Sequence, residues 1–430
     1  MIVNRRLPNM AYSFYVMAKD GRGLFPLLVS FALAGLISGC GPSSPPMMPT
    51  WTAREQSYTP ETPSTNAYDY YAIAAKDAEE AAGEALLNRV YFDEKHRKEL
   101  LEKIGKPVDD VVAATSKKCQ FRYTSPPLFE AAPYQRGWLA IGRALKWKIE
   151  YACATGAYDQ AITYSIAATK FGFDITGGGA TDASLGFEIA DDARRAIAPH
   201  LGKFGAGQLA VLADGLENAL KNKPSLETTI ENEHTRMLEG VQFVQDAYAK
   251  DNFDLLMDTM KESVRDGVQY LRDLKSQDAK KRPAYFEGFA READEQTRYL
   301  KTIAQMPART RATEPGPKLA DVRPWKSFAK QLFSSVEPLL KISDDALART
   351  RLEVLTCQIL RQIKASGSAP KNLKDFPADL TMDPYTGQPF AYRVSGAIFD
   401  IYSVGEDGID NLGDTDEGET YSSPDLKLER

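Results

Sequence analysis

The sequence predicts a mainly α-helical protein, an antiparallel α-hairpin stack or superhelical bundle with a small carboxy-terminal helix plus β-hairpin module. Apolar residues recur at spacings of three and four between residues 68 and 366, and alternating segments are almost absent there. Glycine and proline breaks divide these apolar stripes into segments of helical length. Helices of about 15 to 20 residues joined by short connections lie antiparallel to their neighbours.

The stripes and breaks follow one another in chain order. Apolar stripes occupy residues 72–86, 138–149, 162–169, 209–220 and 352–363. Residues that stop or cap helices separate them, at Gly156, 177–179, Pro199, 205–207, Pro224 with Ser225, Pro307 and 315–317. We therefore expect a helical domain over residues 67–340, followed by a helix plus β-hairpin module over residues 341–416.

Composition and charge narrow the class of protein. Of 430 residues, 43% are hydrophobic and 26% are charged, which excludes a polytopic membrane protein and a wholly disordered chain. The net charge of -6 gives no electrostatic footprint for nucleic acid, so we expect no nucleic-acid partner. The 31 residues from Asp400 onward hold ten acids and two bases, whereas the segment before Cys40 holds four bases and one acid. The two ends of the chain therefore carry most of its net charge, and the residues between them are nearly neutral.

The amino-terminal end has the pattern of an export signal. An apolar run of 14 residues, 24–37, follows a basic cluster and is shorter than the roughly 20 residues of a membrane-spanning helix. Residues 36–40, Leu-Ile-Ser-Gly-Cys, then resemble the lipobox of bacterial lipoproteins. The resemblance implies that residues 1–39 are a signal peptide and that Cys40 is the lipidated first residue of the mature protein. An uncleaved anchor and ordinary cleavage are the alternatives, and Met17 is the start that we expect.

The segment after the lipobox predicts a tether. Residues 40–66 are rich in proline, serine and threonine, and 25 such residues span at most about 75 Å. Gly41 stands where aspartate would resemble the inner-membrane retention signal. We therefore expect an exported, lipid-anchored protein of the cell envelope, at the outer membrane or the surface rather than the inner membrane.

The helical body resembles an uncharacterised family of bacterial helical proteins over residues 109–415. The features that carry the resemblance are Cys119-Gln-Phe-Arg before a proline-rich turn, the helix at 138–155, Gly156-Ala-Tyr-Asp-Gln-Ala, the 212–220 stripe before Pro224-Ser-Leu, and residues 231–240. The resemblance implies no activity. Cys119, Cys153 and Cys357 are expected to be small buried hydrophobes, with a Cys119–Cys153 disulfide as the alternative.

Three constellations in the helical body have sharper interpretations that we weigh against plainer ones. Glu231 and His234 have the spacing of half a di-iron site, but no second Glu-x-x-His exists, so a solvated or capping histidine is expected. Residues 176–182, Thr-Gly-Gly-Gly-Ala-Thr-Asp, resemble a phosphate cradle but lack the Lys-Ser/Thr of a P-loop, so we expect a helix stop followed by an N-cap. Lys117-Lys118 with Phe121, Arg122 and Tyr123 could suggest a nucleic-acid patch, but the cluster is small and the protein is expected to be exported, so we expect a solvated loop.

The carboxy-terminal module carries the most specific signal. Asp383-Pro-Tyr-Thr-Gly precedes two strand patterns, 390–394 and 398–404, joined by a tight hairpin at Ser395-Gly396. Together with the Gly-Glu-Asp-Gly loop that follows, this region resembles the carboxy-terminal region of type II secretion major pseudopilins, whose loop holds calcium. The amino-terminal assembly helix of a pilin is missing, so we expect the module to clamp its preceding helix.

The resemblance implies a calcium site in this loop. By motif, Asp407 and Asp414 are carboxylate ligands and the carbonyl of Val404 is a backbone ligand, with Asp416 as the alternative to Asp414. Calcium prefers six to eight hard oxygens from carboxylates and turning backbone, which this pattern supplies. The alternative is a solvated acidic tail, which we expect for residues 417–430.

These patterns predict a lipid-anchored envelope protein whose activity they do not specify. The sequence contains no Gly-x-Ser-x-Gly, His-Glu-x-x-His or Cys-x-x-Cys motif. We therefore expect a non-enzymatic binding or scaffold protein that contacts the membrane through its lipid and binds an envelope protein partner. The alternative is an envelope hydrolase with a site of dispersed carboxylates.

Overall fold

The computed structural model describes residues 64–83, 93–121, 134–254, 268–269, 272–273, 282–316, 336–413 and 425–428. These residues belong to one compact unit, which begins at residue 46. The predicted signal peptide, Cys40 and nearly all of the predicted tether lie outside the described residues. The structure therefore bears on the helical domain and on the carboxy-terminal module.

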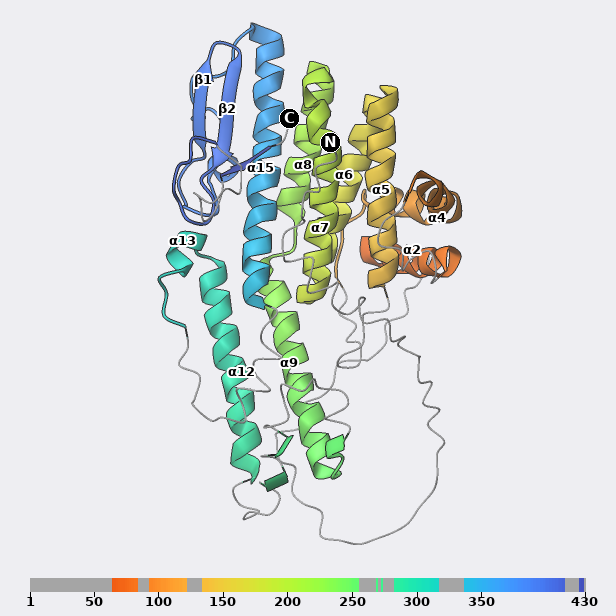
Figure 1. Cartoon of the computed structure of the whole chain (residues 1–430), viewed down its shortest axis with the longest axis vertical. Coiled ribbons are helices and arrows are strands. Elements are labelled where there is room, and N and C mark those ends of the chain that lie inside the picture. Colours follow the sequence, from red (N-terminus) through yellow and green to blue (C-terminus); the bar gives the residue numbers. More distant parts are fainter. Residues whose placement is uncertain are drawn as a thin grey trace, which may run out of the picture. The chain divides into compact units, whose positions relative to one another are not determined.

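The described part is mainly helical, as the sequence predicts (Figure 1). The helices of the body are α2 (Ala67–Ala82), α4 (Glu94–Ala114), α5 (Gln135–Thr155), α6 (Tyr158–Ile175), α7 (Ala180–Ile197), the 3-10 helix η1 (Ala198–Lys203), α8 (Ala206–Asn222), α9 (Leu226–Ala249), α12 (Arg282–Ala304), α13 (Ala308–Arg311) and α15 (Val336–Ser366). Short connections join α5 to α6, α6 to α7, and α8 to α9.

The helix ends use the cap chemistry that their sequences indicate. Gly156 ends α5 in the left-handed conformation, with φ 77°, and Ser225 caps α9 by accepting a hydrogen bond from the Thr228 amide. Asn66 caps α2 in the same way, with the Tyr68 amide as donor. These local bonds satisfy backbone groups that a helix end leaves without partners. The predicted breaks at Gly156 and Ser225 are thereby confirmed.

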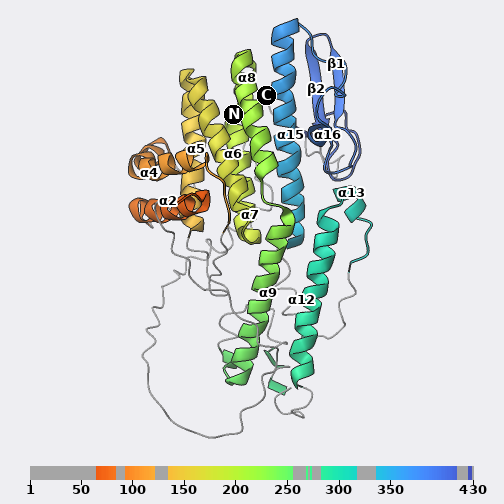
Figure 2. The same ribbon diagram turned by 180° about the vertical axis from the view of Figure 1, so that it is seen from behind.

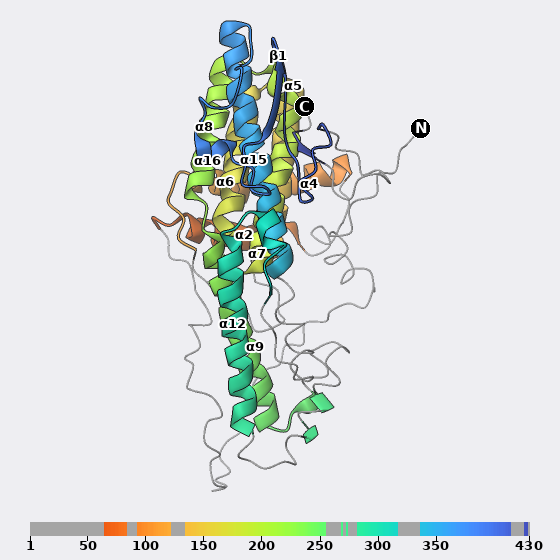
Figure 3. The same cartoon turned by 90° about the vertical axis from the view of Figure 1, so that its left-hand side faces the viewer.

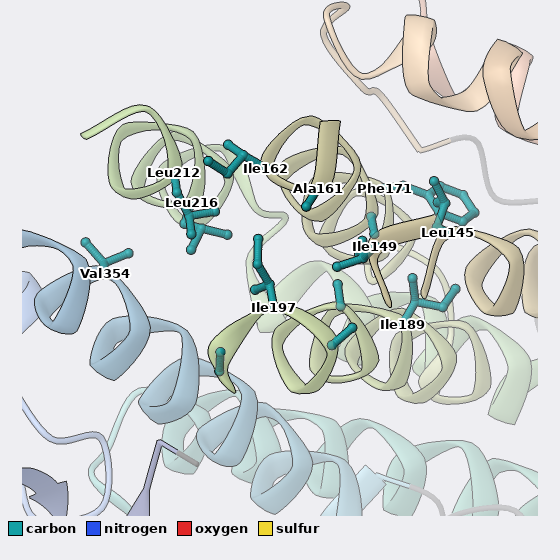
Figure 4. Packing of buried hydrophobic residues seen from close by; sticks show 14 of the residues in the cluster. Leu145, Ile149, Ala161, Ile162, Phe171, Ile189, Ile197, Leu212, Leu216 and Val354 are labelled. Atoms are coloured by element: carbon teal, nitrogen blue, oxygen red, sulfur yellow. The ribbon is translucent and has the colours of Figure 1, made fainter. Parts of the chain in front are cut away.

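One hydrophobic cluster joins most of the helical body (Figure 4). Buried residues from α5, α6, α7, α8 and α15 interlock there, including Leu145, Ile149, Phe171, Ile189, Ile197, Leu212, Leu216 and Val354. Helices α6 and α7 approach so closely that a Cβ atom on Gly172 would lie 2.4 Å from the carbonyl oxygen of Gly186. Only glycine fits at that crossing, because any side chain would separate the two helices.

Helix α15 packs along α7 and α8, and both of its halves contact the carboxy-terminal module (Figure 2). It begins at Val336, so the domain boundary predicted at residues 340–341 falls inside the helix. Helices α9 and α12 pack against each other with a hydrophobic cluster of their own (Figure 3). Val241, Val244 and Leu300 are fully or almost fully buried in that cluster.

The module contains the short helix α16 (Ala378–Thr381) and, in the described residues, an antiparallel sheet of strand order β1-β2-β3. Its strands are β1 (Ala391–Ser395), β2 (Ile398–Ser403) and β3 (Leu426–Lys427). Ser395 pairs with Ile398, so the hairpin turn is Gly396-Ala397, one residue beyond the predicted position. Gly396 has φ 64°, which the first central position of such a turn requires and which glycine adopts without strain.

The predicted solvated tail is wrong for its last described residues. Leu426 and Lys427 form β3 against β2, and Leu428 is buried in the main hydrophobic cluster. The tail is rich in acids, but it contains a short alternating segment, Asp-Leu-Lys-Leu, whose two central residues form the strand. Two leucines on one side of a short strand suffice to bury it against the module.

Candidate functional site

The predicted calcium loop begins where β2 ends and is tied there to the Asp383-Pro turn. The Ser403 hydroxyl donates to Oδ2 of Asp383 at 2.8 Å and accepts from the amide of Gly405 at 3.1 Å. Both side chains are buried. One serine therefore fixes the start of the loop against the turn that precedes the hairpin.

Two of the predicted ligand residues lie in this loop. The Val404 amide hydrogen-bonds to the Asp383 carboxylate. Oδ1 of Asp407 accepts from the Ile409 amide at 3.0 Å. Asp414 and Asp416 lie outside the described residues. The structure thus brings Val404 and Asp407 into one turn and leaves the other two ligands as predictions.

Asp425 joins the loop from β3, and the sequence reasoning missed it. The amides of Gly413 and Asn411 both donate to its carboxylate, Gly413 to Oδ2 at 2.8 Å, while its Oδ1 is buried without a hydrogen-bond partner among the described residues. Burial raises the pKa of Asp425, and the nearby charges of Asp410 and Asp407 add to the rise. A buried carboxylate oxygen without a donor gains much from a cation. The short β-strand pattern around Asp425 was the available signal.

Asp410 lies in the same loop and hydrogen-bonds to both strands of the hairpin. Its carboxylate accepts from the Tyr402 hydroxyl at 2.8 Å and from the Arg393 guanidinium at 3.2 Å. The hydrogen bond from Tyr402 is the main reason that the pKa of Asp410 lies below its usual value. This carboxylate is therefore already satisfied by the strands that flank it.

The described residues do not by themselves form a metal centre. Within the residues that the structure describes, no three His, Cys, Asp or Glu side chains converge in a geometry that could hold a metal ion. Calcium also takes carbonyl oxygens, and two of the predicted carboxylates lie outside this part of the chain. The orphaned oxygen of Asp425 beside the Asp407 turn is the observation that fits a cation.

A second group of acids lies where the Asp383-Pro turn meets α15. The Tyr385 hydroxyl donates to Oδ1 of Asp345 at 2.5 Å, and Arg311 of α13 forms an ion pair with Asp344. Burial raises the pKa of Asp344 to about 7 despite the Arg311 partner, with the Asp345 and Asp383 charges adding to the rise. These carboxylates hold α13, α15 and the turn together.

The short helix α13 docks on the same turn through its backbone. The Ala308 amide donates to the Pro384 carbonyl at 3.1 Å, and the Arg309 amide donates to the Tyr385 carbonyl at 2.9 Å. These are two of the amides that a helix start leaves without intrahelical partners. The end of the α12 segment is therefore attached to the module by hydrogen bonds that need no particular side chain.

A third buried acid, Glu353, lies between α15 and α7. It is 1% exposed, and burial raises its pKa to about 7, with Arg194 lowering it and Asp191 raising it. Arg194 forms an ion pair with Asp191 at 2.8 Å. Oε1 of Glu353 and Nη1 of Arg194 are both buried without hydrogen-bond partners among the described residues. Nothing in the sequence marks this glutamate, because its burial depends on how the helices pack.

The glycine-rich segment 176–182 forms the predicted helix stop and N-cap. The position where an anion would bind, at the start of α7, is occupied by a carboxylate of the chain itself. Helix α6 ends at Ile175 and α7 begins at Ala180, with Gly179 as its N-cap residue. The carboxylate of Glu233, on α9, accepts from the Ala180 amide at 2.5 Å. A carboxylate at a helix start is stabilised by the amides and by the helix dipole. This bond attaches α9 to the start of α7.

The remaining predicted constellations have structural roles. Glu231 lies 2.7 Å from Lys301, and His234 lies 2.8 Å from Asp294, so both residues tie α9 to α12. Cys119, Cys153 and Cys357 are free, so the alternative of a Cys119–Cys153 disulfide is not what the structure contains.

A shallow hollow of about 440 Å³ lies beside the second half of α15. Its lining residues are Gln358, Arg361, Gln362, Ala365, Asp375, Phe376 and Pro377. The lining includes one carboxylate and one guanidinium, and neither the half-buried acids Asp344 and Asp345 nor the buried Glu353 is part of it. The convergent acids that a hydrolase needs therefore do not lie in this hollow.

Among the described helices, none is both long and apolar enough to cross a membrane. Comparisons of the chain with protein-family models, with curated proteins and with solved structures found no match. The candidate site therefore depends on the geometry above and on the sequence patterns that led to it.

Proposed function

We propose that this chain is a lipid-anchored protein of the cell envelope that binds another envelope component without catalysing a reaction. The observation that carries the proposal is how the fold uses its buried and half-buried acids. Asp344, Asp345 and Glu233 each hold one element of the fold against another through a side-chain or backbone partner. Carboxylates employed in this way stabilise a scaffold and are not positioned to reach a substrate.

The lipid anchor rests on the lipobox that ends at Cys40. A thioether-linked diacylglyceryl group and an acyl chain hold a protein at a bilayer, because each buried CH₂ contributes about 0.8 kcal/mol. The test is membrane fractionation of Cys40→Ala beside the unaltered chain, with Cys119→Ala as the matched cysteine control. We expect only Cys40→Ala to leave the membrane fraction. If Cys40→Ala partitions like the unaltered chain, the anchor is not this cysteine.

The calcium loop is the second part of the proposal. The Val404 and Asp407 turn and the orphaned Asp425 oxygen support it, and calcium bound there would fix the end of the module against β3. Thermal melting with calcium, with magnesium and with a chelator tests it. At a calcium concentration of about 100 times Kd, the ligand adds about 2.7 kcal/mol of stability.

The matched variants for that measurement are Asp407→Ala and Asp379→Ala. Asp379 is exposed on α16 and belongs to the same module. We expect the calcium shift to vanish in Asp407→Ala and to persist in Asp379→Ala. A chain that melts identically with calcium and with chelator refutes the calcium site and leaves the lipid anchor standing.

One observation favours a hydrolase instead. Asp344 and Glu353 have pKa values of about 7, the range in which a carboxyl serves as a general acid. Glu353 is buried, however, Asp344 is half-buried and paired with Arg311, and neither lines the hollow beside α15. The test incubates the chain with purified envelope and measures the release of soluble fragments. A release that Glu353→Gln or Asp344→Asn abolishes, in variants that still fold, would favour the hydrolase.

A further inference from the structure

Strand β1 is an edge of the sheet on the side away from the helical body. The strand order of the described sheet is β1-β2-β3, and β2 and β3 pack against α15. The views from front and back agree that β1 lies on the far side of β2 from α15 (Figures 1 and 2). The sheet therefore presents β1 outward, where a further strand has room to pair.

The hairpin register determines which backbone groups point outward. In a two-residue hairpin the flanking residues, here Ser395 and Ile398, form a hydrogen-bonded pair, and such pairs alternate along the strands. The amide and carbonyl groups of Tyr392 and Val394 therefore point away from β2. Among the described residues, no backbone hydrogen bond joins these groups to another segment. Two donors and two acceptors lie in a row at the spacing that an added strand needs.

Exposed apolar side chains gather in the same module. Seven large hydrophobic residues are exposed in the described part of the chain, and five of them belong to the module: Met382, Val394, Ile398, Ile409 and Leu412. Ile398, at the tip of the hairpin, is 77% exposed, and Val394 on the edge strand is 37% exposed. Edges of this kind are normally covered or protected by charge, because they pair readily with other strands.

The charge of the module selects the kind of partner. In the described residues of the module, 370–413 and 425–428, eight acids stand against four bases, so the field around the hairpin is negative. An acidic or neutral strand gains nothing from that field, and a second copy of this module would be repelled by it. A positively charged partner is attracted, associates faster and is held in register.

We propose that β1 is a docking edge for an extended, cationic segment of another protein, which adds to the sheet as a fourth strand. Its backbone pairs with the outward groups of Tyr392 and Val394, its alternate apolar side chains lie beside Val394 on one face of the sheet, and its lysine or arginine side chains lie on the opposite face, which carries Ile398 and Asp400. This recognition mode takes its affinity from main-chain hydrogen bonds and its specificity from alternate side chains. The inference rests on the proposed binding function and names its partner class.

The probes are two labelled peptides that alternate valine with lysine or valine with glutamate. Their binding to the full chain is measured by fluorescence anisotropy, and hydrogen exchange of the β1 segment is measured by mass spectrometry. The decisive variant is Val394→Pro, because proline removes an outward amide and no bond to β2. Val394→Thr is the matched control, since it keeps that amide and the strand propensity.

We expect the lysine peptide to bind, to slow exchange at β1, and to lose about tenfold in affinity with Val394→Pro but not with Val394→Thr. Ile398→Lys, which adds a like charge at an exposed position, also weakens binding without a change in melting temperature. Equal binding of both peptides, or no loss in a folded Val394→Pro chain, overturns the proposal.

Two further outcomes contradict the proposal by giving the edge another occupant. Exchange at β1 that slows with protein concentration alone would assign the edge to a second copy of the chain. Exchange that is slow without peptide and fast after deletion of residues 414–424 would assign it to the chain itself. In each of these cases the Cys40-dependent membrane fractionation is unaffected, so failure here is distinguishable from failure of the proposed function.

Discussion

Replacing Glu353 by glutamine tests how buried acids set the stability of the helical body. The carboxyl is 1% exposed between α15 and α7, and burial raises its pKa from 4.5 to about 7. In the unfolded chain the group titrates near its ordinary value, so between these two pH values the folded state binds the proton more tightly. Stability therefore falls as the pH rises through this window.

The size of the effect follows from the shift in pKa. A tenfold change in proton affinity corresponds to about 1.4 kcal/mol, so ionised Glu353 costs the folded state about 3 kcal/mol above pH 7. Glutamine has nearly the same shape and never ionises, but its buried amide lacks a full set of partners and costs about 1 kcal/mol. We expect Glu353→Gln to be slightly less stable than the unaltered chain at about pH 5 and about 2 kcal/mol more stable at about pH 8.

Urea unfolding followed by circular dichroism at both pH values measures this difference. Asp379→Asn, which changes an exposed carboxyl, is the control and is expected to follow the unaltered chain at both pH values. The reasoning is refuted if Glu353→Gln and the unaltered chain lose stability equally between the two pH values, or if the glutamine variant is the less stable one at the higher pH. Either result would mean that Arg194 compensates the buried charge completely.

Three other substitutions probe contacts that the fold depends on. Glu233→Ala leaves the Ala180 amide without its carboxylate and is expected to cost about 1 to 3 kcal/mol in urea unfolding, whereas Glu233→Gln retains an acceptor and costs less. Gly172→Ala forces α6 and α7 apart and is expected to cost more than about 2 kcal/mol, seen as a lower melting temperature. Tyr385→Phe removes the hydrogen bond to Asp345 and is expected to cost about 1 to 2 kcal/mol, with faster hydrogen exchange in the Asp383-Pro turn; unchanged exchange would contradict that role.

The fold class was predictable because its signals are local. Gly156 and Ser225 mark helix ends through their own backbone preferences, and the 209–220 stripe repeats at the helical period. These signals can be recognised without knowing which elements pack against them. The hairpin was placed within one residue because few sequences fit a two-residue turn. The long helix α15 was expected to begin with the module at residue 341, and it begins five residues earlier, at Val336.

The buried acids were not predictable, because burial is a tertiary property. Glu353 and Glu233 occur in ordinary helical sequence and acquire their roles only when α7 packs against α15 and α9. The role of Asp425 was missed for a different reason, because the run of acids around it resembles a solvated tail. Two leucines after Asp425 were the signal for β3, but a two-residue strand is too short for periodicity to reveal.

The central claim, that the chain is a lipid-anchored envelope protein, is tested most directly by the mass of its amino terminus. The measurement is mass spectrometry of the amino-terminal proteolytic fragment after the protein is extracted from isolated membranes. The account predicts a fragment that begins at Cys40 and carries a diacylglyceryl group and an acyl chain. A fragment that begins before residue 40, or that begins at Cys40 with an unmodified thiol, would contradict it.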